Sequence, residues 1–363
     1  MLSRKPPYPG FSVGPIKVDV PLLLAPMEDV TNLAFRLIAK RIGGPGLMFT
    51  EFVSAMAIHH GAHKTLKKMR VEEDERPLGI QIFGGVPDVM AETARVAEET
   101  GADIVDINMG CWVPKVCRTG SGAALLKDPE LATRIVRAVV EAVDVPVTVK
   151  VRAGWDYSLF AAPELAKRFQ DAGAQMITLH ARFAKQGFEG EADWRLIREL
   201  REAVEVPLVG NGDIKTGDDA RRMIDETGCD AVMVGRAAIS NPWALARIRA
   251  GLTGEDEPAD PTLDERISVA VEHARLMTAF EAEMDSWKEI VELPPEERER
   301  LELKAVRSLR GQLPLYIKGL PGAAQVRGKL SRSSSVSELE DILEGFRESL
   351  ADAPPQGEVQ SVR

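Results

Sequence analysis

The chain contains 363 residues, of which 44% are hydrophobic and 28% charged, so it can bury a substantial core and is not wholly disordered. Its formal net charge of −10 argues against a surface that binds nucleic acid everywhere, because phosphate binding needs clustered Lys and Arg. No apolar run approaches the roughly 20 residues that span a bilayer, and the start of the chain lacks a signal-peptide core. We therefore expect a soluble cytoplasmic protein.

The chain has three cysteines, Cys111, Cys117 and Cys229, and five histidines. An odd cysteine count in a chain of this length fits a reducing compartment rather than a disulfide framework. No cysteine pair has Cys-x-x-Cys spacing, and the histidines complete no zinc pattern with them. We predict no structural metal.

Short apolar runs alternate with longer amphipathic segments between Pro21 and Val234, which is typical of repeated βα units and a parallel sheet. The predicted strands are Pro21–Ala25, Leu47–Thr50, Leu78–Phe83, Ile104–Asn108, Val147–Val151, Met176–His180, Leu208–Asn211 and Ala231–Val234. The predicted helices between them are Leu33–Ile42, Asp88–Thr100, Pro129–Val143, Pro163–Ala172, Trp194–Val204 and Asp218–Glu226. Eight strands in this alternation predict an α/β fold, a closed (β/α)8 TIM barrel.

The alternative architecture is an open, doubly wound sheet, which would have a Gly-x-Gly-x-x-Gly turn after its first strand. The first predicted strand is instead followed by Pro26-Met-Glu-Asp, without a glycine that could let a pyrophosphate approach. The pattern therefore favours the barrel.

The strand pattern stops after Trp243, and residues 251–261 are rich in Gly, Glu, Asp and Pro, as in a linker. Four helices are then predicted, Leu263–Met284, Pro295–Leu309, Ala323–Leu330 and Val336–Leu350. We expect a catalytic barrel over residues 1–250, a small all-helical domain over 262–350 and a disordered tail over 351–363.

Active sites of (β/α)8 barrels lie at the carboxyl ends of the strands, often with a phosphate site after strands seven and eight. Here these loops read Gly210-Asn-Gly-Asp and Gly235-Arg-Ala, which offer close backbone approach and a cation. The plain alternative is that the glycines only turn tight loops. Their pairing at these two strands favours a phosphate-bearing cofactor.

Other predicted strands end in polar side chains that would point into the same mouth, namely Gln81, Asn108, Lys150 and His180. Singly, Lys150 could be a structural ion-pair partner and His180 a satisfied core histidine. Cys111 follows the fourth strand, where a thiol with a reference pKa of about 8.5 could serve as a proton donor or a nucleophile. A buried apolar cysteine is the better description of Cys229, and Cys117 is undecided.

Taken together and in chain order, eight motifs resemble the tRNA-dihydrouridine synthase family, most closely its B-type bacterial branch. They are Ala25-Pro-Met-Glu-Asp-Val-Thr-Asn, Gln81-Ile-Phe-Gly, Asp106-Ile-Asn-Met-Gly-Cys, Gly120-Ser-Gly-Ala-Ala-Leu-Leu, Thr148-Val-Lys-Val-Arg-Ala-Gly-Trp, Leu179-His-Ala-Arg, Gly210-Asn-Gly-Asp and Gly235-Arg-Ala. Tyr316-Ile-Lys-Gly-Leu-Pro-Gly-Ala extends the similarity into the helical domain. One departure is Trp112, which stands where the family usually has a proline after its cysteine.

The resemblance implies an FMN in the barrel mouth, reduced by NADPH (or NADH), that passes hydride from N5 to C6 of a tRNA uridine while a cysteine protonates C5. Cys111 matches that cysteine. The residues implied to hold FMN are Pro26, Met27, Gln81, Lys150, His180, Asn211, Gly212, Asp213, Gly235 and Arg236. Those implied to face the substrate are Asn108, Lys150, His180, Arg182 and Lys318.

One stretch, from Leu303 to Ser333, is basic and contains no Asp or Glu. Its cations are Lys304, Arg307, Arg310, Lys318, Arg327, Lys329 and Arg332. A solvated helix face is the plain explanation, but the lack of acidic residues in an acidic chain favours a tRNA-binding surface. No obligate protein partner and no membrane contact is indicated.

Three other functions stay open. The first is an FMN barrel that acts on a free pyrimidine, like a dihydroorotate dehydrogenase, which would not need the basic stretch. The second is a Schiff-base aldolase with Lys150 as its nucleophile and no flavin. The third is a non-catalytic RNA-binding protein on a barrel that has lost its activity.

Overall fold

The computed structural model describes residues 7–351 and divides the chain into two units. The first covers the chain up to Ala238 together with Pro242–Pro258, and the second covers Ile239–Asn241 and the chain from Ala259 onward. Residues 352–363, most of the predicted tail, lie outside the described part.

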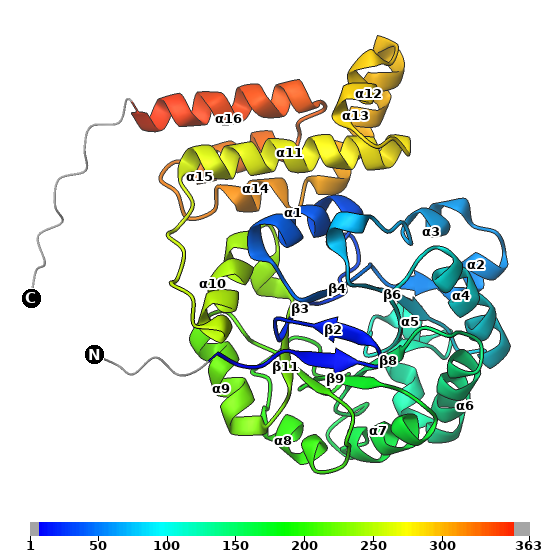
Figure 1. Cartoon of the computed structure of the whole chain (residues 1–363). Coiled ribbons are helices and arrows are strands. Elements are labelled where there is room, and N and C mark those ends of the chain that lie inside the picture. Colours follow the sequence, from blue (N-terminus) through cyan, green and yellow to red (C-terminus); the bar gives the residue numbers. More distant parts are fainter. Residues whose placement is uncertain (1–6, 352–363) are drawn as a thin grey trace, which may run out of the picture. The chain divides into compact units, whose positions relative to one another are not determined.

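Eight parallel strands form the closed barrel of the first unit, as predicted (Figure 1). They are β3 (Leu22–Leu24), β4 (Leu47–Phe49), β6 (Leu78–Phe83), β7 (Ile104–Met109), β8 (Val147–Arg152), β9 (Met176–His180), β10 (Leu208–Asn211) and β11 (Ala231–Val234). Pairing runs in sequence order and closes where β11 pairs with β3 and β4 pairs with β6. The two-residue strand β5 (Val53–Ser54) adds to the side of β6.

The inside of the barrel has an apolar end and a polar end. One buried cluster takes residues from the start of the strands, including Ile104, Met176 and Ala231, together with Phe49 from β4. Further along the same strands the inward positions carry polar side chains, because every second residue of a strand faces the same side. The polar end is the carboxyl end, where barrel active sites lie.

A hairpin that the sequence reading did not predict covers the apolar end. It consists of β1 (Phe11–Val13) and β2 (Ile16–Val18), joined at Gly14, whose φ is +54°. Val13 and Val18 belong to the same buried cluster as the strand starts, and Figure 1 shows the hairpin lying across the barrel opening. The segments Phe11–Val13 and Ile16–Val18 each hold two apolar residues around a polar one, which is too little for an apolar run or a period-two signal.

Helices follow most barrel strands, and their ends carry recognisable caps. The side chain of Asn32 accepts a hydrogen bond from the Phe35 amide at the start of α1 (Leu33–Gly43), and Gly44 ends it in the left-handed conformation. The other helices of this unit are α2 (Ala55–His59), α3 (His63–Lys67), α4 (Pro87–Glu99), α5 (Pro114–Cys117), α6 (Pro129–Val140), α7 (Ala162–Asp171), α8 (Arg195–Arg201), α9 (Gly217–Thr227) and α10 (Pro242–Thr253). Helix α10 ends at Thr253 and so covers the first three residues of segment 251–261, which was expected to be a linker.

The second unit is helical over its described residues. Its helices are α11 (Leu263–Ala282), α12 (Trp287–Glu292), α13 (Pro295–Leu309), α14 (Leu313–Tyr316), α15 (Ala323–Leu330) and α16 (Val336–Ala351). A capping box of Thr262 and Glu265 begins α11, which packs against α13 and α16. Between residues 7 and 351, no helix is long and apolar enough to cross a membrane.

Candidate active site at the carboxyl end of the barrel

The strand register brings the predicted polar residues into one ring. Gln81 pairs with Asp106 across β6 and β7, and Asn108 pairs with Lys150 across β7 and β8. His180 of β9 pairs with Asn211 of β10 on its other side. Side chains from five consecutive strands therefore meet at the mouth.

Cys111 lies in a loop that Asn108 holds in place. The Asn108 Oδ1 accepts hydrogen bonds from the amides of Gly110 and Cys111 at 3.0 and 2.9 Å, and its Nδ2 donates to Gln81 Oε1 at 2.7 Å. The thiol is partly exposed. Burial raises the pKa of Cys111, so the thiol keeps its proton near neutral pH and can donate it.

Beneath this loop lies a carboxyl group that the sequence reading did not single out. Asp106 is 1% exposed and accepts hydrogen bonds from Gln81 Nε2 and Thr148 Oγ1, both at 2.5 Å. Burial raises the pKa of Asp106 to about 7. Asp106 thus fixes Gln81, which in turn fixes Asn108, so the Cys111 loop rests on a buried hydrogen-bond chain.

Lys150 reaches into the ring from β8. Its Nζ donates to Asn211 Oδ1 at 3.1 Å, and Asn211 Nδ2 donates to the carbonyl oxygen of Met233 at 2.8 Å. Burial, with a contribution from the Arg152 charge, lowers the pKa of Lys150 to about 8. A lysine in this state is a donor that can lose its proton within an accessible pH range.

Basic side chains surround His180. The imidazole Nε2 lies 3.3 Å from Arg182 Nη1, and burial followed by the charges of Lys150 and Arg152 holds the pKa of His180 well below its usual value. Asp213 accepts from Arg182 Nη2 at 2.6 Å and from Arg236 Nη2 at 2.8 Å. Although burial raises the pKa of Asp213, the Arg182 hydrogen bond and other contacts bring it below its usual value.

Arg152 is a central residue of the site that the sequence reading missed. It is 2% exposed, and its guanidinium donates to the carbonyl oxygens of Gly110, Phe183 and Gly187 at 2.8–3.1 Å. These bonds join the Cys111 loop to the loop after β9. Its position two residues after Lys150 places it on the same strand face, so the period of the strand was the available signal.

Pro26 and Met27 lie in the loop after β3, and this loop is tied to the next one. The Asp29 amide donates to Glu51 Oε1 at 2.8 Å, and Lys68 Nζ donates to the same oxygen at 3.1 Å. The Met27 amide donates to Thr31 Oγ1 at 2.9 Å. Glu51 and Lys68 were not predicted as partners, because their contacts join segments that are distant in the sequence.

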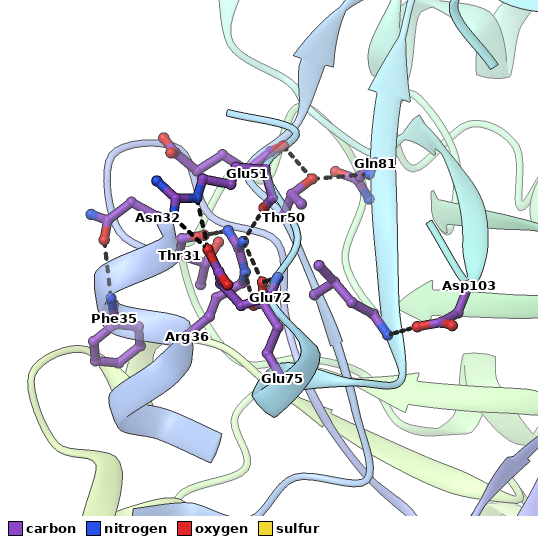
Figure 2. A network of polar contacts seen from close by, with 12 residues as sticks. Thr31, Asn32, Phe35, Arg36, Thr50, Glu51, Glu72, Glu75, Gln81 and Asp103 are labelled. Atoms are coloured by element: carbon purple, nitrogen blue, oxygen red, sulfur yellow. Dashed lines mark hydrogen bonds and ion pairs between the residues drawn. The ribbon is translucent and has the colours of Figure 1, made fainter. Parts of the chain in front are cut away.

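A buried ion pair supports the same loop. Arg36 donates through Nε to Glu75 Oε2 at 2.6 Å and through Nη1 to the carbonyl oxygen of Thr31 at 3.0 Å. Figure 2 shows this pair beside the start of α1, with Thr50 between Glu51 and Gln81. The Thr50 hydroxyl donates to the Glu51 carbonyl and accepts from the Gln81 amide, which connects the loop network with the ring.

Two glycines of the predicted phosphate site differ in what they do. Gly212 has a φ of +136°, and a Cβ there would lie 2.6 Å from the Ala192 Cβ, so the fold itself requires glycine. At Gly235 a Cβ would meet only the Met27 Sδ at 3.6 Å and the Ala25 Cβ at 3.7 Å, which are ordinary contacts. The fold itself therefore does not require a glycine at this position.

The arrangement fits an anionic ligand. Arg152, Arg182 and Arg236 lie close enough to His180 to lower its pKa, while the Asp213 carboxylate pairs with two of these three cations. The buried Arg182 Nε has no hydrogen-bond partner among the described residues. A phosphate would supply both the charge and the acceptor.

Lys318, the last predicted substrate-binding residue, is exposed and follows α14 in the helical unit. The other cations of the basic segment are exposed as well. Lys304 forms an ion pair with Glu281 at 2.5 Å, whereas Arg307, Arg310, Lys318, Arg327, Lys329 and Arg332 have no ion pair with another described residue.

Comparison with solved structures shows the same fold in proteins of low sequence identity. A histamine dehydrogenase from Rhizobium sp. matches with a TM-score of 0.54 at 15% identity, over 78% of this chain and 52% of that longer chain. A variant of morphinone reductase in complex with tetrahydroNAD matches with a TM-score of 0.51 at 13% identity, over 68% of this chain and 91% of that one.

Sequence comparison is more specific. The model of the family described as dihydrouridine synthase (Dus) matches residues 23–351. The "Probable tRNA-dihydrouridine synthase 1" of Synechocystis sp. is 38% identical over 336 residues, 92% of this chain and 88% of that protein. The "tRNA-dihydrouridine synthase B" of Pseudomonas aeruginosa is 37% identical over 322 residues, 88% of this chain and 90% of that protein. The chain therefore belongs to the dihydrouridine synthase family.

Proposed function

We propose that this protein reduces the C5–C6 double bond of uridine in tRNA to 5,6-dihydrouridine, with FMN as its bound flavin and NADPH or NADH as the reductant. The observation that carries the proposal is that a partly exposed, protonated Cys111 lies at the same barrel mouth as the basic cluster around His180. Family membership supports the substrate, since the relatives are named as tRNA-dihydrouridine synthases.

FMN would be held by the residues that the sequence resemblance implied. Gly235 would let the phosphate approach the backbone, and Arg236 would supply a guanidinium, with Gly212 and Asp213 shaping the neighbouring loop. Lys150, Asn211 and Gln81 would line the ring system, with Pro26 and Met27 on the side of β3. When bound, the flavin supplies the hydride.

The chain's own residues would position the uracil and supply a proton. Lys150 and His180 present donors in the mouth, where negative charge develops on the uracil carbonyls as hydride arrives. Cys111 holds the proton for C5, and Asn108 fixes the backbone that carries it. Arg182, which bonds to Asp213 and Gly190 and lies 3.3 Å from the His180 Nε2, would face the uracil beside His180.

The test is anaerobic reoxidation of the pre-reduced holoenzyme by unmodified tRNA. The wild type is expected to reoxidise, and Cys111→Ala to be slowed by a factor on the order of 10²–10⁴, the range for loss of a general acid. Cys117→Ala is the matched control, because Cys117 ends the nearby helix α5 and its thiol donates to the Cys111 carbonyl oxygen at 3.4 Å. Equal rates for wild type and Cys111→Ala would refute the role of Cys111.

The same experiment separates this proposal from the other functions. Reoxidation by free uracil or orotate, but not by tRNA, would indicate a free pyrimidine substrate. Protein that binds tRNA without reoxidising would indicate an RNA-binding role. Protein without flavin absorbance that borohydride traps with a keto substrate would indicate an aldolase.

The basic segment, Leu303–Ser333, would bind the tRNA backbone. Reversing the charge of Arg327 and Lys329 is expected to weaken tRNA binding and to reduce the slope of log Kd against log salt by about 1 for each lost phosphate contact. Lys304→Glu is the matched control, because the Lys304 ammonium already pairs with Glu281. An unchanged salt slope in the double variant would contradict the role of this segment.

A further inference from the structure

Aromatic side chains are exposed along one side of the barrel mouth. Trp112, Tyr157 and Phe188 come from the loops after β7, β8 and β9, which are neighbours in the sheet, and they are 37%, 70% and 51% exposed. Large apolar groups at a mouth are an energetic cost unless something covers them. The proposed chemistry of Cys111 and the flavin uses none of the three.

Trp112 is held in a defined position although it is exposed. Its ring meets Phe188 edge to face, with centroids 6.2 Å apart and an interplanar angle of 81°. A Cβ at Gly187 would lie 3.3 Å from the Trp112 Cζ2, so the indole packs directly on that backbone. Gly187 has a φ of +60°, which favours glycine. The indole is therefore a preorganised surface.

Phe188 connects this surface to the site. Its centroid lies 6.2 Å from that of His180, and the guanidinium carbons of Arg236 and Arg152 lie 4.7 and 5.7 Å from it. Arg152 also donates to the carbonyl oxygen of Gly187, the residue under Trp112. The aromatic pair is thus fixed to the β7 and β9 loops and to the end of β8, and it is flanked by two cations.

Exposed aromatic rings flanked by guanidinium groups suit an unpaired nucleotide. Bases stack on aromatic faces whatever their identity, and phosphates bind the cations beside them. A substrate uridine must leave its stack to reach the floor of a barrel mouth, which leaves its chain neighbours unstacked at the rim. Trp112 stands beside Cys111 in the chain, so the rim begins one residue from the proposed proton donor.

We propose that Trp112 and Phe188 stack the base of a nucleotide adjacent to the target uridine in tRNA. This inference rests on the proposed function and deepens it, because it names residues that position the RNA strand rather than the reacting base. The nicotinamide dinucleotide of the proposed function is also planar and anionic and would fit the same rings. The experiment distinguishes its binding from that of the tRNA nucleotide.

The experiment is a double-mutant cycle that combines the Trp112→Ala variant with tRNA that lacks one base, on one side or the other of the target uridine. At one position the wild type is expected to lose about tenfold in kcat/KM for reoxidation, in the range of one base–aromatic stack. Trp112→Ala is expected to lose less than about twofold at that position, since its stacking partner is already absent. On intact tRNA, Trp112→Ala should raise KM about tenfold with little change in kcat.

The controls separate stacking from folding. Trp112→Phe should restore most of the affinity, and all variants should keep the wild-type flavin spectrum and melting temperature. An equal loss for wild type and Trp112→Ala at every abasic position would overturn the inference. Slower flavin reduction by NADPH in Trp112→Ala, with unchanged use of tRNA, would overturn it in favour of the dinucleotide. Failure of the wild type with intact tRNA would instead overturn the proposed function.

Discussion

Replacing Glu75 by Gln removes one charge of a fully buried ion pair without changing its shape. Glu75 and Arg36 are 0% and 1% exposed, and the Arg36 guanidinium donates to both carboxylate oxygens, at 2.6 and 3.1 Å. The carboxylate also accepts from the Glu72 amide. The variant leaves a buried guanidinium beside an amide that offers only one acceptor oxygen.

The expected loss can be worked from this geometry. Removing one partner of a buried ion pair lowers the free energy of unfolding by about 3–5 kcal/mol. Because the Gln side chain keeps one acceptor oxygen, we expect a loss near the lower end, about 3 kcal/mol. For a unit of this size 1 kcal/mol lowers the melting temperature by about 2–4 °C, which gives a decrease of roughly 6–12 °C. The Thr31 carbonyl oxygen, held by Arg36, also becomes less fixed, so the Met27 loop should loosen.

The assay is thermal unfolding followed by circular dichroism, with Glu73→Gln as the control. Glu73 lies in the same short 3-10 helix, Glu73–Glu75, but its side chain is 87% exposed and pairs with Arg76. Surface pairs of this kind contribute about 0–1 kcal/mol. Melting of Glu75→Gln within about 2 °C of wild type, or an equal decrease for Glu73→Gln, would refute the reasoning.

Three further predictions follow from the site. The pKa of Asp106 is about 7 in the folded chain, so between about pH 4 and 7 the folded state holds a proton on this carboxyl that the unfolded state has lost. The free energy of unfolding of the wild type should therefore fall relative to that of Asp106→Asn as the pH rises through this range, and the difference should be constant above it. Lys150, with a pKa of about 8, loses its charge above that pH, so flavin affinity should fall there in fluorescence titrations, and Lys150→Met should lack the step. Gly212→Ala should lower the melting temperature, whereas Gly235→Ala should melt like wild type and lose flavin affinity; equal melting of the two variants would contradict the distinction.

Much of the architecture could be predicted from local sequence. The runs from Leu78 to Phe83 and from Met176 to His180 have the bounds of β6 and β9 because short apolar segments between turn residues are a local signal. Lys150 and His180 could be placed at the mouth for the same reason, since the end of a parallel strand fixes which edge its side chains reach.

The tertiary structure determines which groups contact the residues of the site. The carbonyl partners of Arg152 come from the β7 and β9 loops, and Glu51 bonds a loop that begins more than twenty residues earlier. Trp112 reads in the sequence only as a departure from the family pattern, and its partner Phe188 lies in a loop with no motif. Periodicity and turn chemistry act between near neighbours along the chain, so a sequence determines strands and their ends. Loop conformation and barrel closure join distant segments, so only the folded chain determines what those ends touch.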